Sequence, residues 1–180
     1  MNKSVYDSPN RATDINRHIL TILVDNEPGV LARVIGMFSG RGYNIDSLNV
    51  AEVSNQHLSR ITIVTQGTKE VIDQIQSQLM RIVPVHSVTN LDQEDSAVEA
   101  EVALVNMFIN EKNKKQSFQI CDLYRARKIE NEHNSTIFEI AGTSERIDMF
   151  IKDIGKVTSI EIVRSGPVAI STDNNIQEEE

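Results

Sequence analysis

The stretch HILTILVDNEPGVLARV, residues 18–34, decides which fold this chain can adopt. Its first seven residues, His18 to Val24, are mostly Ile, Leu and Val, a composition typical of a buried strand. The polar run Asp25-Asn26-Glu27 ends that strand, and we expect it to supply the cap of a helix with Pro28 at its first position. The stretch therefore predicts a strand, a tight turn and a helix.

The residues after Pro28 predict an amphipathic helix whose first turn is open to a ligand. Apolar residues recur at helical spacing, at Leu31, Val34, Ile35 and Phe38. The first N–H groups of a helix lack acceptors within the helix, and Gly29 has no side chain to shield them. We expect Gly29, Val30 and Leu31 to offer these donors to a small anion such as a carboxylate. A plain helix cap remains the alternative interpretation.

The rest of the first half predicts alternating elements. Residues 43–53 and 58–65 have strand composition and are joined by a turn, residues 71–79 predict a second amphipathic helix, and residues 83–88 a last strand. The order β-α-β-β-α-β is that of ferredoxin-like folds, in which right-handed crossovers place both helices on one face of an antiparallel sheet.

The second half of the chain repeats the first. The segments Gly67–Asp73 and Gly142–Asp148 lie 75 residues apart and are identical at five of seven positions. Apolar residues correspond at the same offset: Ile75 with Phe150, Leu79 with Ile154, Val85 with Ile160, and Val88 with Val163. Strands are expected over 98–109 and 136–140, with a helix over 115–126. Residues 110–115 replace the Asp-Asn-Glu-Pro-Gly turn and contain neither Gly nor Pro, so we expect only the first copy to bind a ligand.

The sequence therefore predicts an α+β protein made of two ferredoxin-like βαββαβ domains. Residues 18–91 form the first, residues 98–171 the second, and the polar, acidic segment 92–97 is expected to link them. Residues 1–17 lack the apolar core of a targeting signal and are expected to be a disordered arm. Residues 172–180 end in three Glu and are expected to be a disordered acidic tail.

Composition excludes several function classes. The net charge of −8 and the pI near 5.0 disfavour a nucleic-acid surface, which needs Lys and Arg contacts to phosphates. No run approaches the roughly 18 apolar residues of a membrane helix. The single cysteine, Cys121, allows no internal disulfide, and the four histidines are scattered without metal-ligand spacing. We find no catalytic constellation and expect no metal site.

The run HILTILVDNEPGVLARVIGMFSGRGYNIDSLNVAEV, followed by LSRITIV and EIVRSGPVAIS, closely resembles the small regulatory subunit of acetohydroxyacid synthase (acetolactate synthase). The resemblance covers residues 17–171 and is strong over 18–91. It is weaker in the second half, where residues 106–115 and 128–135 depart from the family pattern. The resemblance implies an N-terminal ACT domain, a module that binds amino acids, and a C-terminal ACT-like domain.

The resemblance also implies a function and a site. The chain would be a non-catalytic regulatory subunit that activates the catalytic large subunit and confers feedback inhibition by valine, or another branched-chain amino acid, in branched-chain amino acid biosynthesis. It would be a homodimer through its ACT domains, with valine bound by residues that match the family motif: Asn26, Gly29, Val30, Leu31, Ile45, and Asn44 reaching across from the neighbouring subunit. This chain would hold no cofactor, because thiamine diphosphate, Mg²⁺ and FAD belong to the catalytic subunit. The implied compartment is the cytoplasm, or the plastid stroma for a plant or algal source.

Three alternatives stay open at the level of sequence. The chain could be an ACT-type amino-acid-binding regulator of another enzyme. An RNA-binding module shares the element order, but it needs exposed aromatic residues on its middle strands, and residues 58–65 contain none. A small acylphosphatase-type enzyme would need an Arg and an Asn at a phosphate loop, whereas Arg33 lies on the expected helix and the loop before it is acidic.

Overall fold

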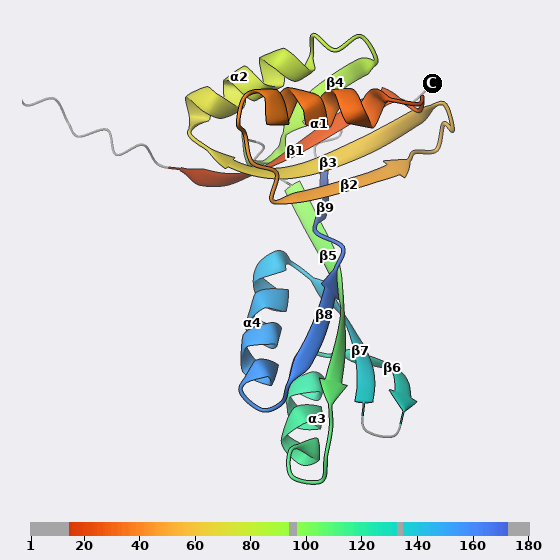
Figure 1. Cartoon of the computed structure of the whole chain (residues 1–180), viewed down its shortest axis with the longest axis vertical. Helices are drawn as coiled ribbons and strands as arrows, with labels where there is room; N and C mark the ends of the chain where they lie inside the picture. The colour runs from red at the N-terminus through yellow and green to blue at the C-terminus, as the bar shows by residue number, and fades with distance from the viewer. Residues whose placement is uncertain (1–14, 94–96, 133–134, 173–180) are drawn as a thin grey trace, which may run out of the picture.

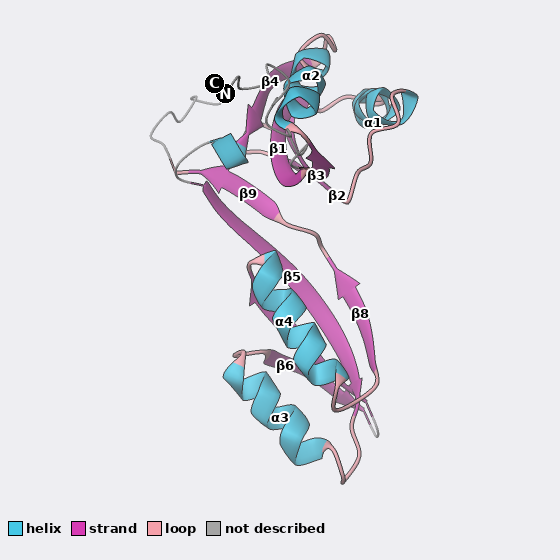
Figure 2. Ribbon diagram, turned by 90° about the vertical axis from the view of Figure 1, so that its left-hand side faces the viewer, coloured by secondary structure: helices cyan, strands magenta, loops and turns pink. Residues whose placement is uncertain are grey.

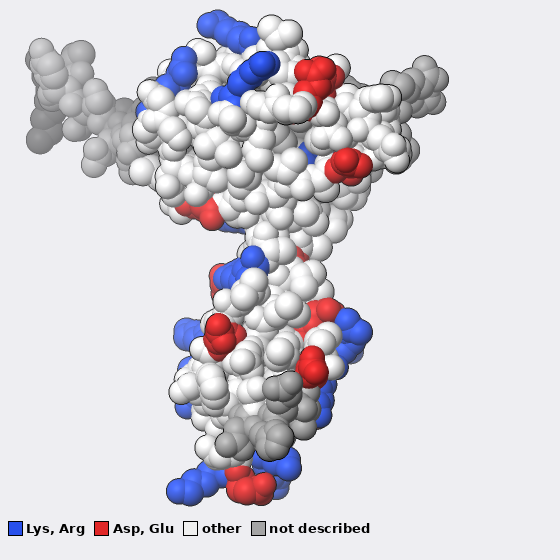
Figure 3. Space-filling view, turned by 45° about the vertical axis from the view of Figure 1, so that its right-hand side comes forward, with Lys and Arg blue, Asp and Glu red and all other residues white. Residues whose placement is uncertain are grey.

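The computed structural model describes residues 15–93, 97–132 and 135–172, which form two α+β domains joined at a narrow waist (Figures 1 and 3). The first domain contains β1 (Asn16–Asp25), α1 (Val30–Gly40), β2 (Ser47–Glu52), β3 (Leu58–Gly67), α2 (Lys69–Leu79) and β4 (Val85–Asn90). Its antiparallel sheet has the order β2-β3-β1-β4, and both helices lie on one face (Figure 1). The ferredoxin-like fold predicted from the sequence is confirmed.

The second domain repeats this arrangement and adds a strand. Its elements are β5 (Ala97–Phe108), α3 (Lys114–Leu123), β6 (Arg127–Glu132), β7 (Ser135–Gly142), α4 (Ser144–Gly155), β8 (Ile160–Arg164) and β9 (Val168–Ser171). The order β6-β7-β5-β8 matches that of the first sheet. The repeat predicted part of the core correctly, because Ile75, Leu79, Phe150 and Ile154 are all fully buried. It was wrong at Val163, the residue matched with Val88, which is 65% exposed.

The extra strand β9 was not expected from the sequence. Strand β5 is 12 residues long, and β8 pairs only with its second part, Ala103–Met107. After a break at Gly166 and Pro167 the chain pairs again with the first part of β5, so β9 and β5 form a two-stranded ribbon that reaches the first domain (Figure 2). There Ala169 packs in a buried cluster with Ile19, Val64 and Leu91.

The expected linker is partly ordered structure. Residues Leu91–Gln93 form a short 3-10 helix, η1, and Leu91 is buried in the cluster that contains Ala169. Ala97 already belongs to β5, and residues 94–96 lie outside the described part. The expected disordered arm and tail also lie outside it, except that Ile15 to Arg17 and Thr172 are described and β1 starts at Asn16. Helix η1 was not predicted, because the segment 92–97 is polar and the one apolar residue of η1, Leu91, comes just before that segment.

Two expected boundaries near α1 were wrong. The helix begins at Val30, and its N-cap is Gly29 in a left-handed conformation (φ 88°) with no side-chain cap. Pro28 therefore lies in the turn before the helix. The expected capping side chains have other partners, because Asp25 pairs with His86 and Asn26 with the β2–β3 hairpin. Strand β2 begins at Ser47 rather than at residue 43, since residues 43–46 lead the chain from α1 to the sheet.

Candidate functional site

The turn before α1 exposes backbone donors. The Val30 N–H makes only a long hydrogen bond to the Glu27 carbonyl, at 3.4 Å, and the Arg33 N–H reaches the Gly29 carbonyl at 3.1 Å. Within the described residues the N–H groups of Gly29, Leu31 and Ala32 have no acceptor. A Cβ built on Gly29 would meet nothing within 4 Å. The first turn of α1 is therefore open to a small anion, and the positive end of the helix dipole favours one.

The two apolar residues predicted at this turn have different surroundings. Val30 is 3% exposed and belongs to the core of the first domain, whereas Leu31 is 36% exposed. Of these two side chains, that of Leu31 is thus the one free to touch a ligand. Val30 contributes its backbone position, because its side chain is already packed.

Asn26 faces the β2–β3 hairpin. Its Nδ2 donates to Glu52 Oε1 and to the Gln56 carbonyl, both at 3.0 Å, while its backbone N–H donates to the His57 carbonyl at 2.7 Å. These bonds fix the strand-to-helix turn against the hairpin. Oδ1 of Asn26 has no partner among the described residues, so it is the atom of this side chain left for a ligand.

Asn44 and Ile45 lie beyond the other end of α1. Ile45 packs half-buried against the first core, and Asn44 is exposed, with its Nδ2 donating to Asp46 Oδ1 at 2.6 Å. Helix α1 has 11 residues, so at 1.5 Å per residue it is about 16 Å long, and Gly29 and Asn44 lie beyond its opposite ends. One chain therefore does not bring the two halves of the predicted site together. Which residues bind a ligand stays a prediction.

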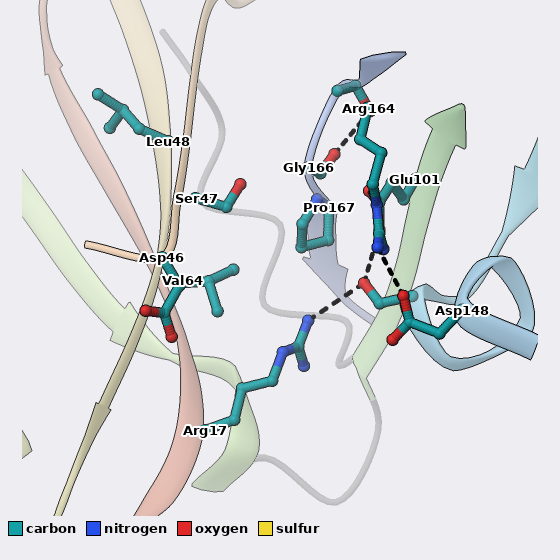
Figure 4. Close-up of a pocket in the computed structure, with 12 residues that line it drawn as sticks. Arg17, Asp46, Ser47, Leu48, Val64, Glu101, Asp148, Arg164, Gly166 and Pro167 are labelled. Atoms are coloured by element: carbon teal, nitrogen blue, oxygen red, sulfur yellow. Dashed lines mark hydrogen bonds and ion pairs between the residues drawn. The ribbon is translucent and has the colours of Figure 1, made fainter. Parts of the chain in front are cut away.

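A second feature, which sequence reasoning missed, is a cavity of about 520 Å³ between the two domains (Figure 4). The first domain contributes Arg17, Asp46, Ser47, Leu48 and Val64 to its wall, and the second contributes Glu101, Ser144, Asp148 and residues 164–167. None of the predicted ligand residues lines this cavity or a smaller one, of about 340 Å³, that Arg17 also lines.

A chain of charged hydrogen bonds crosses the wall of the large cavity. Arg17 binds Glu99 at 2.9 Å and reaches Ser144 Oγ at 3.5 Å, and Ser144 Oγ donates to Glu101 Oε2 at 2.8 Å. Arg164 donates to both carboxylate oxygens of Glu101, at 2.6 and 2.8 Å, and to Asp148 (Figure 4). The sequence did carry a signal, since Glu101 occupies the inward-facing phase of β5 shared by buried Ala103, Val105 and Met107.

The environment of Glu101 favours its charged form. Its side chain is 2% exposed, and the hydrogen bonds from Arg164, followed by that from Ser144, lower the pKa of the carboxyl against the opposing effect of burial. The same pairing raises the pKa of Arg164. Both groups are therefore ionised at neutral pH and hold the end of β8 to β5.

Cys121 is a buried core residue of α3. It is 1% exposed, lies 3.9 Å from Met107 Sδ, and burial raises the pKa of its thiol to about 12. Because the thiolate is the reactive form, we expect no reaction with Ellman's reagent in the native chain at pH 8 and one equivalent of reaction in urea. Rapid labelling of the folded protein would contradict this placement.

Within residues 15–93, 97–132 and 135–172, no three His, Cys, Asp or Glu side chains are grouped so as to hold a metal ion. No helix within the same residues has the length and apolar character to cross a membrane.

Comparison with known proteins places both domains. Residues 20–87 match the AHAS small subunit-like ACT domain, and residues 100–173 match the family described as the small subunit of acetolactate synthase. The chain is 39% identical over 163 residues to the acetolactate synthase isozyme 3 small subunit of Escherichia coli, covering 89% of this chain and 98% of that protein. The corresponding Salmonella typhimurium protein is 38% identical over the same shares. The crystal structure of the acetolactate synthase small subunit from Thermotoga maritima superposes with a TM-score of 0.78 at 34% identity, covering 87% of this chain and 98% of that one.

Proposed function

The chain belongs to the family of acetolactate synthase small subunits, and from this premise we propose that it is the valine-sensing regulatory subunit of that enzyme. It binds and activates the catalytic large subunit and makes it subject to feedback inhibition by valine or a related branched-chain amino acid. Its role is regulatory, within branched-chain amino acid biosynthesis. The chemistry takes place on the catalytic subunit, to which we assign thiamine diphosphate, Mg²⁺ and FAD. We propose the cytoplasm as its compartment.

The observation that carries the proposal is the open first turn of α1. The N–H groups of Gly29, Leu31 and Ala32 have no acceptor in the described residues, and no side chain shields them at Gly29. An amino acid's carboxylate would accept these hydrogen bonds at the positive end of the helix dipole. Charge-assisted hydrogen bonds of this kind contribute roughly 1.5–3 kcal/mol each to stability in protein interiors.

The side chain of the effector is selected by burial. Burying the isopropyl group of valine is worth about 1.5–3 kcal/mol, which favours valine over alanine by at least roughly tenfold. One more methylene changes binding by only about 1–3 kcal/mol, so isoleucine and leucine are expected to bind as well.

We propose that the effector lies between two copies of the first domain. The support is the separation of the predicted residues within one chain, with Gly29 and Asn44 beyond opposite ends of α1. In a two-fold dimer Asn44 of the partner would supply the missing half of the site. Its Oδ1, which has no partner among the described residues, would accept from the ligand's ammonium. The exposed edges of a four-stranded sheet are also surfaces that proteins generally cover.

Calorimetry with valine, leucine and isoleucine, joined to sedimentation of the full chain, tests the proposal. We expect a dimer that binds valine, and an Asn44→Ala chain whose affinity is lower by roughly tenfold, as expected when a hydrogen bond to a charged group is lost. Asn106→Ala, a substitution in the second domain, is the matched control and should bind valine as the unaltered chain does. A monomer that binds valine at full strength would refute the shared site.

A further inference from the structure

The connector between β8 and β9, Ser165–Pro167, rests against the start of β2 in the other domain. The Asn49 Nδ2 donates to the Pro167 carbonyl at 3.0 Å. Gly166 has φ +73°, and a Cβ built on it would overlap Ser47 Oγ and lie only 3.0 Å from Ser47 Cβ. Only glycine combines this conformation with so close an approach.

The connector is firmly held by the second domain. Arg164, the residue before it, bonds both oxygens of buried Glu101, and also Asp148. Ser165 exchanges two hydrogen bonds with the backbone of Val102, at 2.9 and 3.1 Å. The connector therefore moves together with β5 and β8 as one body.

On the other side of the contact, Ser47 belongs to the segment that carries Asn44. Asp46 accepts from Asn44 Nδ2 at 2.6 Å and from Gln66 Nε2 at 2.9 Å. Thr65 Oγ1 donates to the Asn44 carbonyl at 2.6 Å. A ligand that forms a hydrogen bond with Asn44 thus acts on the segment that positions Ser47, three residues further along the chain.

The junction between the domains offers few other contacts. Arg17 lines two cavities, of about 520 and 340 Å³, so the two domains are not joined by continuous packing there. The buried cluster of Ile19, Val64, Leu91 and Ala169 forms one point of attachment, and the hydrogen bonds of Arg17 to Glu99 and Ser144 form a second. The connector on β2 forms a third, and small shifts there would turn the domains about the other two.

We propose that Ser47 and Gly166 are positioning residues, through which occupation of the effector site sets the orientation of the second domain. This rests on the proposed function, because the effector residue Asn44 belongs to that site. Inhibition needs two conformations of the protein, one of which the ligand favours. In this proposal the Ser47–Gly166 contact couples the conformation of the first domain to the orientation of the second.

The Gly166→Ala chain tests the proposal. If Ser47 Oγ rotates away, the added methyl still lies 3.0 Å from Ser47 Cβ, and it should push the connector off β2, since the Ser47 backbone is fixed in the β2–β3 ladder. We expect valine affinity by calorimetry within about twofold of the unaltered chain, and normal activation of the catalytic subunit. In the reconstituted holoenzyme the valine concentration for half-inhibition should rise by roughly tenfold or more, a typical size for coupling between sites.

A rescue variant separates the contact from backbone strain. Ser47→Gly added to Gly166→Ala keeps the strained conformation but removes the overlap, so inhibition should return to within about threefold of the unaltered level, near the lower limit of typical site-to-site coupling. Gly155→Ala, whose Cβ would make an ordinary 3.9 Å contact with Ile160, is the control and should change nothing. Absence of rescue would assign the effect to strain and overturn the proposal.

The remaining outcomes are also decisive. A folded Gly166→Ala chain with unaltered inhibition overturns the proposal while leaving valine sensing intact. If Gly166→Ala does not fold, Asn49→Ala removes the hydrogen bond to Pro167 instead. It should weaken inhibition at unchanged valine affinity, and unaltered inhibition would again overturn the proposal. If the unaltered chain binds no branched-chain amino acid, the proposed function fails first and this coupling fails with it.

Discussion

Replacing Gly29 with Asp is expected to abolish valine binding and leave a holoenzyme that runs uninhibited in valine. The new carboxylate would lie at the N-cap of α1, beside the free N–H groups that we assign to the effector's own carboxylate. At an effective dielectric constant near 20, two like charges about 4 Å apart repel by roughly 4 kcal/mol before screening. This equals or exceeds the gain of about 1.5–3 kcal/mol from burying the valine side chain.

The Gly29→Asp chain should still fold. Nothing lies within 4 Å of a Cβ at Gly29, and although its φ of 88° is unfavourable for most residues, Asp and Asn tolerate it best. A carboxylate at a helix N-terminus also interacts favourably with the helix dipole. Activation of the catalytic subunit should therefore persist, as measured by acetolactate formation with reconstituted subunits across a valine series.

Gly29→Asn is the matched control, because it adds nearly the same volume without the charge. We expect it to weaken valine binding less than Gly29→Asp does, and the difference between the two measures the charge repulsion. Inhibition of the folded Gly29→Asp holoenzyme at the unaltered valine concentration would mean that the carboxylate binds elsewhere and that the turn is only a helix cap.

Replacing Arg164 with Met should have the largest effect on stability. It leaves the Glu101 carboxylate, 2% exposed, without its cation. Breaking a buried ion pair costs about 3–5 kcal/mol, and because Arg164 is itself 35% exposed, water would reach part of the vacated space, so we expect roughly 3 kcal/mol. Arg127→Met is the control, since the Arg127–Glu139 pair on the same sheet is exposed and its loss should barely move the melting temperature. Equal melting temperatures for the two variants would contradict the assigned role of Glu101.

The Glu101 pair also predicts a dependence on pH. Arg164 lowers the pKa of Glu101 below its ordinary value of 4.5, so the folded state binds this proton more weakly than the unfolded chain does. The stability that the pair contributes is fully present above pH 4.5 and is lost as the pH falls through the lowered pKa. In the Arg164→Met chain the largest cause of the lowered pKa of Glu101 is lost, and burial is opposed by the hydrogen bonds from Ser144 and Gly166. The deficit in melting temperature should therefore be largest at neutral pH and shrink on acidification below pH 4.5, as measured by circular dichroism.

Periodicity and internal repetition were enough to predict the fold. The spacing of apolar residues gave the two helices of the first domain, and the repeat of Gly67–Asp73 at Gly142–Asp148 predicted the second copy, with Phe150 and Ile154 in its core. These signals are local or repeated, so they do not depend on how the domains meet. The predicted start of α1 was wrong because it depended on distant contacts. The partners of Asp25 and Asn26, on β4 and the β2–β3 hairpin, are far away in sequence.

The junction could not be predicted from the sequence, because it depends on long-range contacts. Strand β9 pairs with residues about 70 positions earlier in the chain. Its four residues, Val168–Ser171, are too few for an alternation of apolar and polar residues to predict a strand. The cavity beside Arg17 requires knowing that Glu101, Ser144 and Arg164 meet. Gly29, Val30 and Leu31 were predicted from the free N–H groups of a helix start. Asn26, Asn44 and Ile45 were added through family resemblance, since the fold of one chain does not bring the two halves of the site together.

The β5–β9 ribbon limits how freely this protein can be recombined. Its two halves look modular in sequence, with a polar stretch at 92–97 that invites a crossover between relatives. A chimaera joined there would set one parent's Ala169 against the other parent's Ile19 and Val64, and one parent's Gly166 against the other's Ser47. The first domain and the C-terminal segment from Gly166 to Ser171 must therefore be exchanged together. We expect a chimaera to fold well only when both pieces come from one parent, so the last strand of the chain belongs with the first sheet.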